Sequence, residues 1–375
     1  MNDALHQGYL KLPLAQPTND FHIVQYADDT ILIVEADVNQ LIHLKGLLQS
    51  FATSTSLLVN YSKSSMIPIN VHSEKLVVLA SAFSCAIGSM PFTYLGLPMG
   101  TTKPRMEDLT PLMDRMERRL SSCSSLLSYS GCLEMLNSAI TPITTYAMCT
   151  LKLPVVVLDN LDRIRKQCLW RGNDRSKKGG NLAAWLMVLK PKVKGGLGVQ
   201  NLRLQNDALL LKQLTKFYNK KDIPWVQQVW FKYYPNGKVP HATGELGSFW
   251  WKDLLRLSIL FRGIARCHIG DGSTVLFWDD LWSSEVFSLK YPLLYRSARD
   301  HHLSVKSVMI TEDLNTLFAL PLSEQAYVQF QNLQAELLTI TYEKGRADSW
   351  SFLWGSHVYS SKNFMIWLSG ILQLR

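Results

Sequence analysis

The chain has 375 residues, of which 47% are hydrophobic and 18% charged, so it can bury a sizeable core and is not an intrinsically disordered protein. Its six cysteines include no Cys-x-x-Cys pair, which argues against a zinc site and a disulfide framework. No apolar run approaches the roughly 18 residues that span a bilayer, so we expect an intracellular protein, in the nucleus or cytoplasm, that is neither secreted nor bound to a membrane.

The net charge of +9 is unevenly distributed along the chain. Residues 1–60 contain two lysines and six acidic residues, whereas residues 161–240 contain seventeen Lys and Arg and four Asp. The second segment thus has a net charge of +13, more than the whole chain. Clustered cations attract polyanions and release their counterions, so the sequence predicts a nucleic-acid partner. A solvated helical surface is the alternative interpretation.

The first predicted element is a β-hairpin that carries two adjacent acids, Asp28 and Asp29, at its tip. Apolar and β-branched residues dominate the flanking runs Phe21–Tyr26 and Thr30–Val34, as buried strands require. Two carboxylates on one tip can hold Mg²⁺, and two-metal phosphoryl transfer needs closely placed acids. An Asp-rich turn without a metal is the alternative.

Further along the chain, strands and helices alternate up to residue 100. Helical spacing of apolar residues predicts helices over Val38–Thr53 and Ser73–Phe83. A short apolar run predicts a strand over Leu57–Asn60, and glycine and proline punctuate a tight hairpin over Phe92–Gly100.

Beyond Met106 the pattern becomes helical. The spacing predicts a bundle of helices over Leu109–Leu120, Gly131–Tyr146 and Val156–Trp170. A further helix over Leu202–Tyr218 places lysines 212, 216 and 220 on one stripe.

The remaining predicted elements are a helix over Phe249–Ile264 and a turn that leads into a strand over Val275–Trp278. All eleven tryptophans lie at Trp170 or later. We expect most of them to pack in the core, although some could stack on unpaired bases.

These blocks, in this order, resemble the reverse transcriptases of plant LINE-type (non-LTR) retrotransposons. The blocks that carry the resemblance are Tyr26-Ala27-Asp28-Asp29, residues 57–64 with Asn60 and Lys63, residues 92–98, residues 127–131, residues 168–172, residues 192–201, Gly270-Asp271-Gly272 and residues 277–282. The resemblance covers nearly the whole chain.

The resemblance implies roles for individual residues. Asp28 and Asp29 would be catalytic ligands of Mg²⁺, and Lys63 would stabilise the departing pyrophosphate. The hairpin of Tyr94, Leu95, Gly96, Leu97 and Pro98 would grip the primer. The cations that would contact the phosphates of an RNA template and a DNA primer are Arg163, Arg165, Lys166, Arg171, Lys190, Lys192, Lys194, Lys212 and Lys216.

The expected fold is α+β: part of a polymerase palm, with an antiparallel sheet and packed helices, then a mainly α-helical thumb and a basic helical region. The expected divisions are a palm over residues 1–100, a thumb over 101–172, a basic connecting region over 173–245, a Gly-Asp-Gly region over 246–340, and the truncated start of a zinc-binding segment over 341–375. The sequence does not indicate an oligomeric state.

The resemblance implies RNA-directed DNA synthesis, in which a dNTP is transferred to a primer 3′ end. Such an enzyme needs fingers and a further metal-binding Asp before the Tyr26 box, and 25 residues precede that box here. We therefore expect this chain alone to be inactive. The alternatives are a nucleic-acid-binding module without catalysis and the non-functional product of a decayed element.

Overall fold

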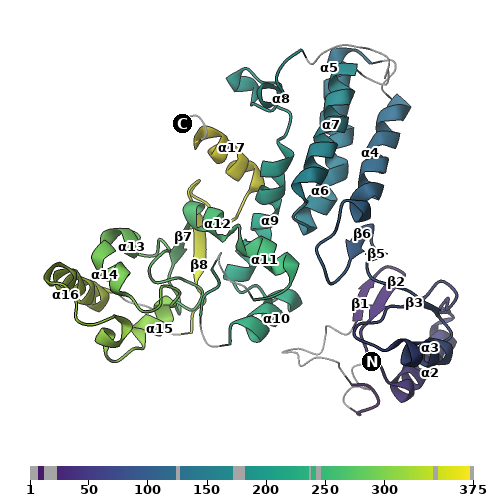
Figure 1. The fold of residues 1–375 in the computed structure, drawn as a ribbon, viewed down its shortest axis with the longest axis horizontal. Coiled ribbons are helices and arrows are strands. Elements are labelled where there is room, and N and C mark those ends of the chain that lie inside the picture. Colours follow the sequence, from purple (N-terminus) through teal and green to yellow (C-terminus); the bar gives the residue numbers. More distant parts are fainter. Residues whose placement is uncertain are drawn as a thin grey trace. The chain divides into compact units, whose positions relative to one another are not determined.

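The computed structural model describes residues 7–11, 23–123, 127–171, 182–235, 238–241, 246–340 and 345–371. The chain forms two compact units (Figure 1). The first comprises residues 1–104 with 222–232, and the second comprises residues 105–221 with 233–375. The fold is α+β and mostly helical, and the described residues form four two-stranded sheets.

The first unit begins with the predicted hairpin. Strand β1 (Ile23–Tyr26) pairs antiparallel with β2 (Asp29–Leu32), and Tyr26 lies opposite Asp29. Ala27 closes the tip in the left-handed region with φ +52°. This short connection leaves Asp28 in the turn and places Asp29 at the start of β2, which confirms the hairpin.

Two helices pack together beside this hairpin: α2 (Val38–Thr55) and α3 (Ser73–Phe83). The Asp37 side chain caps α2 by accepting a hydrogen bond from the Gln40 N–H at 3.0 Å. Both predicted helices are confirmed. Their shared core contains Leu41, Leu44 and Leu79, and Leu32 of β2 packs against it.

The strand predicted over Leu57–Asn60 is wrong. These residues are irregular, and the Leu57 and Leu58 side chains are exposed. The local strand forms instead at β3 (Ser65–Met66), which pairs in parallel with β4 (Ala86–Ile87). An apolar run needs a partner strand, and the backbone of this run has none within the described residues.

The first unit also contains the second predicted hairpin, which is confirmed as β5 (Phe92–Tyr94) paired antiparallel with β6 (Leu97–Met99). Most of α10 (Pro224–Tyr233) belongs to this unit as well, and it buries Val226. The sheets of the first unit are thus separate two-stranded ladders, whereas the sequence predicted one antiparallel sheet.

The second unit opens with the predicted helical bundle. Helix α4 lies beside α7, and α5 continues through η4 into α6 (Figure 1). The bounds are η2 (Glu107–Leu109), α4 (Thr110–Cys123), α5 (Tyr129–Met135), η4 (Leu136–Ile140), α6 (Thr141–Thr150) and α7 (Val155–Arg171). The η4 segment is a π-helical turn within this otherwise α-helical stretch.

Helix α9 (Leu202–Tyr218) forms the centre of the second unit and has the predicted bounds. It packs against α6, α7, α11, α12 and α17, which explains why Leu211, Leu214 and Phe217 are fully buried. Two short elements precede it, α8 (Trp185–Val188) and η5 (Lys192–Lys194).

The helix predicted over Phe249–Ile264 divides into α11 (Phe249–Leu255) and α12 (Ser258–Ile264). The strand predicted over Val275–Trp278 is wrong, because this segment forms a turn with a single bridge from Leu276 to Ser304. The local ladder is instead β7 (Ala265–His268) paired antiparallel with β8 (Ser349–Phe352).

The remaining elements are mostly short helices. Their bounds are α13 (Phe287–Lys290), α14 (Pro292–Ser297), α15 (Val305–Met309), η6 (Leu314–Leu317), α16 (Glu324–Thr339) and α17 (Ser361–Ile371). Helix α17 lies along α9 (Figure 1), and the Tyr359 hydroxyl donates to the Ala208 carbonyl oxygen at 2.8 Å. The described part of residues 341–375 therefore packs within the second unit.

Among the described residues, no helix is both long enough and apolar enough to cross a bilayer. Five cysteines in this part of the chain are free thiols: Cys85, Cys132, Cys149, Cys168 and Cys267. Burial raises the pKa of the Cys168 thiol to about 12, so this side chain acts as a small apolar core residue.

Candidate nucleic-acid interface

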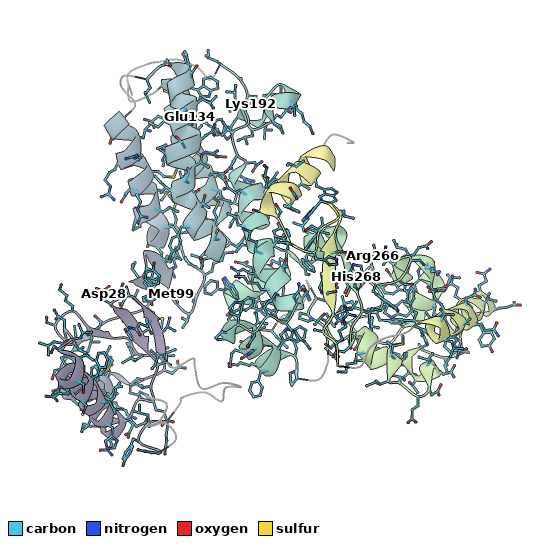
Figure 2. All side chains as sticks on the ribbon, turned by 180° about the vertical axis from the view of Figure 1, so that it is seen from behind. Asp28, Met99, Glu134, Lys192, Arg266 and His268 are labelled. Carbon is cyan, nitrogen blue, oxygen red and sulfur yellow. The ribbon has the colours of Figure 1, made fainter. Side chains whose placement is uncertain are left out.

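The two hairpin acids lie at an exposed tip of the first unit (Figure 2, where Asp28 is labelled). Asp28 occupies the turn, and Asp29 begins β2. Neither carboxylate has a hydrogen bond or ion pair in the structure. The tip thus presents two anionic oxygen donors to solvent, the ligand type that Mg²⁺ prefers.

These two acids supply only part of a magnesium coordination shell. Within the described part of the chain, no group of three or more His, Cys, Asp or Glu could hold a metal ion. Lys63 lies in an exposed turn. The Lys63 backbone N–H donates to the carbonyl oxygen and to Oδ1 of Asn60, both at 3.2 Å. No hydrogen bond or ion pair joins Lys63 to Asp28 or Asp29.

The predicted primer-grip residues form the β5–β6 hairpin. Tyr94 pairs with Leu97, and the turn residues Leu95 (φ +49°) and Gly96 (φ +77°) are both left-handed. This conformation suits a two-residue hairpin and costs least at glycine. Leu97 is buried and Pro98 half-buried, and the buried Tyr94 hydroxyl has no hydrogen-bond partner. The hairpin is therefore a tight two-residue turn between two short strands.

The second unit contains the larger set of predicted cations. Arg163 and Lys166 lie one turn apart on α7, and Lys166 stacks over Trp185 of α8, with its Nζ 5.6 Å from the ring centroid. Lys190, Lys192 and Lys194 follow α8 (Figure 2, where Lys192 is labelled). We call these residues the basic surface: Arg163, Lys166, Lys190, Lys192 and Lys194.

A glycine-dependent turn fixes the lysines of the basic surface. The Gly198 N–H donates to the Lys190 carbonyl oxygen at 2.9 Å, and the Gly196 N–H donates to that of Pro191 at 3.2 Å. A Cβ at Gly196 would overlap the Lys190 carbonyl oxygen, so only glycine fits this position. The turn therefore presents Lys190 and Lys192 to solvent, with Lys194 partly exposed.

Arg165, which we expected at this surface, is fully buried. Its guanidinium donates to the Asp162 carboxylate and to the Gln200 carbonyl oxygen, both at 2.7 Å. Burial lowers the pKa of Arg165, and Asp162 opposes this shift. Because its side chain has no access to solvent, Arg165 is not part of the candidate interface and instead joins α7 to the segment before α9.

The other predicted cations lie elsewhere. Lys212 and Lys216 are exposed one turn apart on α9, as the stripe predicted. The side chain of Arg171 lies outside the described residues. One further basic feature was not singled out from the sequence: α4 carries Arg115, Arg118 and Arg119 on a common face.

The Gly-Asp-Gly block is a structural junction. The buried Asp348 carboxylate accepts hydrogen bonds from the N–H groups of Gly270 (2.9 Å), Gly272 (2.8 Å) and Thr274 (2.9 Å), and from the Thr274 hydroxyl (2.8 Å). A Cβ at Gly270 would overlap the carbonyl oxygens of Arg346 and Ala347. The glycines thus let this loop approach the segment that contains Asp348.

The adjoining aromatic block is buried as expected, with Phe277, Trp278 and Trp282 in the core. Asp280 forms a buried ion pair with Arg262 of α12, and its other oxygen accepts the Leu276 N–H at 2.6 Å. Burial raises the pKa of Asp280 and Arg262 opposes that shift. Asp280 therefore helps to organise the core of the second unit.

Comparison with known proteins gives two distant relatives, both from Arabidopsis thaliana. The chain is 28% identical over 179 residues to the putative ribonuclease H protein At1g65750, a match that covers 46% of this chain and 28% of that protein. It is 27% identical over 143 residues to the uncharacterized mitochondrial protein AtMg00310, which covers 37% of this chain and 92% of that protein. No family model matches the chain.

Proposed function

We propose that this chain is a retroelement-derived protein that binds nucleic acid through the basic surface of its second unit. The observation that carries the proposal is the exposure of Lys190 and Lys192 at a turn that only glycine permits, together with the exposure of Arg163 on α7. The distant similarity to a putative ribonuclease H protein supports it, because a substrate of such a protein is a nucleic acid.

Charge around the basic surface favours a polyanion. Residues 175–206 contain seven Lys and Arg and no Asp or Glu. Neither the Lys190 nor the Lys192 ammonium group has a hydrogen bond or ion pair with the described residues, so both can reach a ligand. Contacts of this kind neutralise phosphates and release counterions, and they bind any sequence. The proposed activity is therefore sequence-independent binding of RNA or DNA.

The test is fluorescence anisotropy with a labelled single-stranded RNA and a labelled DNA duplex. The variant Lys190→Glu/Lys192→Glu/Lys194→Glu should bind at least about tenfold more weakly, because it removes three phosphate contacts and adds three repulsive charges. The matched control is Lys75→Glu/Arg296→Glu/Lys362→Glu, which makes the same charge change at exposed cations outside the candidate interface. Equal affinities of the two variants would contradict the proposal.

A second proposal concerns the reverse-transcriptase lineage. In it, Asp28 and Asp29 are ligands of Mg²⁺, Lys63 stabilises pyrophosphate, and the β5–β6 hairpin holds the primer. The exposed double-acid tip between two short strands favours this proposal. Because the described residues provide no third ligand beside the tip, we propose that the chain alone does not extend a primer. Magnesium-dependent extension by the purified chain, abolished by Asp28→Ala, would contradict that part.

A further inference from the structure

A groove in the second unit lies between α4 and the helical stretch of η4 and α6. Its volume is about 580 Å³. The residues that line it are Arg115, Arg118, Arg119, Ser138, Ala139 and Ile143. Half of these residues are thus arginines, and none is acidic. We call this feature the arginine groove.

Helical geometry explains why the three arginines converge. Positions 115, 118 and 119 are spaced i, i+3 and i+4, so they lie on one face of α4. Met116 and Leu120 are buried against the bundle on a neighbouring face. Asp114 lies one turn before Arg118 on the helix, and neither Asp114 nor Glu117 lines the groove.

The opposite wall is made by the π-helical turn. In η4 the Thr141 N–H donates to the Leu136 carbonyl oxygen, five residues earlier. Such turns are rare and frequently occur at functional sites. The small side chains Ser138 and Ala139 line this wall and leave room opposite the arginines. Glu134, labelled in Figure 2, lies one turn before Ser138, and its carbonyl oxygen accepts the Ser138 hydroxyl at 2.7 Å.

The side chains of the three arginines line the groove and are open to solvent. All three arginines are exposed. Arg115 and Arg118 have no side-chain hydrogen bond or ion pair in the structure. A guanidinium presents several N–H donors in a planar fork that matches a phosphate. Ala139 and Ile143 add apolar surface on which a sugar can pack.

We propose that the arginine groove is a second nucleic-acid site, which binds the phosphodiester backbone of one strand. The inference rests on the proposed nucleic-acid binding of this chain and adds a contact outside the basic surface. A nucleic acid is favoured over an acidic peptide because the same unit carries most of the cations of residues 161–240, and a long polyanion can contact both features. Contacts to the backbone alone make the site independent of sequence.

The test is the salt dependence of binding to a single-stranded RNA and to a DNA duplex. The variant Arg115→Gln/Arg118→Gln/Arg119→Gln should bind at least about tenfold more weakly than the wild type. The slope of log K against log salt concentration should be smaller in magnitude by about 2–3. Each lost phosphate contact reduces the magnitude of this slope by roughly 0.7–0.9. The variant with lysine at the same three positions should keep most of the affinity, which separates loss of charge from loss of structure.

The control Lys75→Gln/Arg296→Gln/Lys362→Gln has the same change in net charge and should bind like the wild type. Loss of binding by the basic-surface variant, with no change in the glutamine variant of the groove, would overturn the arginine groove and leave the proposed function standing. Failure of the wild type to bind either nucleic acid would overturn both. Binding of poly-glutamate at the groove with unchanged RNA and DNA affinity would also overturn it.

Discussion

Asp348 shows how one side chain can hold together two distant parts of the chain. Its carboxylate bonds residues up to 78 positions earlier, and four donors converge on its two oxygens. The buried N–H groups of Gly270, Gly272 and Thr274 would otherwise have no partner. This arrangement gives the Gly-Asp-Gly block a structural role within the second unit.

We predict that Asp348→Ala lowers the free energy of unfolding by about 3–5 kcal/mol, because it leaves several buried donors unsatisfied. Asp348→Asn should cost less, since its amide oxygen still accepts hydrogen bonds. Chemical denaturation followed by tryptophan fluorescence measures both. The control Asp313→Ala, in an exposed 3₁₀ turn, should change stability by about 1 kcal/mol or less. A similar small change for Asp348→Ala would contradict the assigned role.

A second prediction concerns pH. His241 stacks on His302, with ring centroids 4.7 Å apart, and burial, His302 and Arg262 lower the pKa of His241 while Asp279 opposes them. The unfolded chain therefore takes up a proton at higher pH than the folded chain does. Stability should be greatest above about pH 6.5 and should fall as the pH drops through that value toward the lowered pKa.

Thermal unfolding at pH 7.5 and pH 5.0 tests this prediction. His241→Gln should lose less Tm between pH 7.5 and pH 5.0 than the wild type does. The control His72→Gln, at an exposed position, should lose as much Tm as the wild type. An unchanged pH dependence in His241→Gln would show that this pair does not govern acid stability.

For Arg165, local charge and helical periodicity predict different environments. The basic stretch around it predicts a surface cation. Its neighbours at i−4, i+3 and i+4 are Leu161, Cys168 and Leu169, all buried, so the helical pattern already placed position 165 on the apolar face. The sequence also places an acidic partner for it, Asp162, at i−3. The contact with Gln200 could not be predicted, because it joins segments 35 residues apart.

At the scale of elements, helices were predictable and short strands were not. Helices α3 and α9 have the predicted bounds, since an apolar stripe at helical spacing depends on local sequence alone. The β7–β8 ladder joins residues more than 80 positions apart, so no local pattern identified it. The apolar run Leu57–Asn60 suggested a strand but lacks a partner.

The turn before α9 gives an element-scale prediction. Gly196→Ala should weaken RNA binding several-fold without changing any charge, because the added Cβ would displace the Lys190 backbone and move the lysines of the basic surface. The matched control is Gly195→Asn: this position has φ +76° and open space, and asparagine tolerates that conformation. Equal RNA affinities of the two variants, measured by anisotropy, would show that the turn does not position the lysines.

A second prediction at this scale concerns the buried ion pair between Arg262 of α12 and Asp280. Arg262 also donates to the Tyr218 hydroxyl and the Pro240 carbonyl oxygen, both at 3.2 Å. Arg262→Met should lower the free energy of unfolding by about 3–5 kcal/mol, because it leaves the Asp280 charge buried and unpaired. Arg256→Met, which removes the exposed partner of Asp253, should cost about 1 kcal/mol or less. Equal costs in urea denaturation would contradict this role.

For the whole molecule, composition indicated a polyanion partner but not the surfaces that would hold it. The count of cations in residues 161–240 predicts the partner class, yet only the fold shows that Lys190 and Lys192 are exposed on a common turn. The arginine stripe of α4 lies outside that segment, in a helix that also contains two acids, so the net charge of the helix does not reveal the stripe.

Nucleic-acid binding by the second unit is the central claim, and ultraviolet cross-linking to a uridine-rich RNA with peptide mapping tests it most directly. We predict cross-linked peptides from residues 160–203 and from α4, and their loss at high salt. Cross-links confined to residues 1–104, or none above those of an acidic control protein, would contradict it.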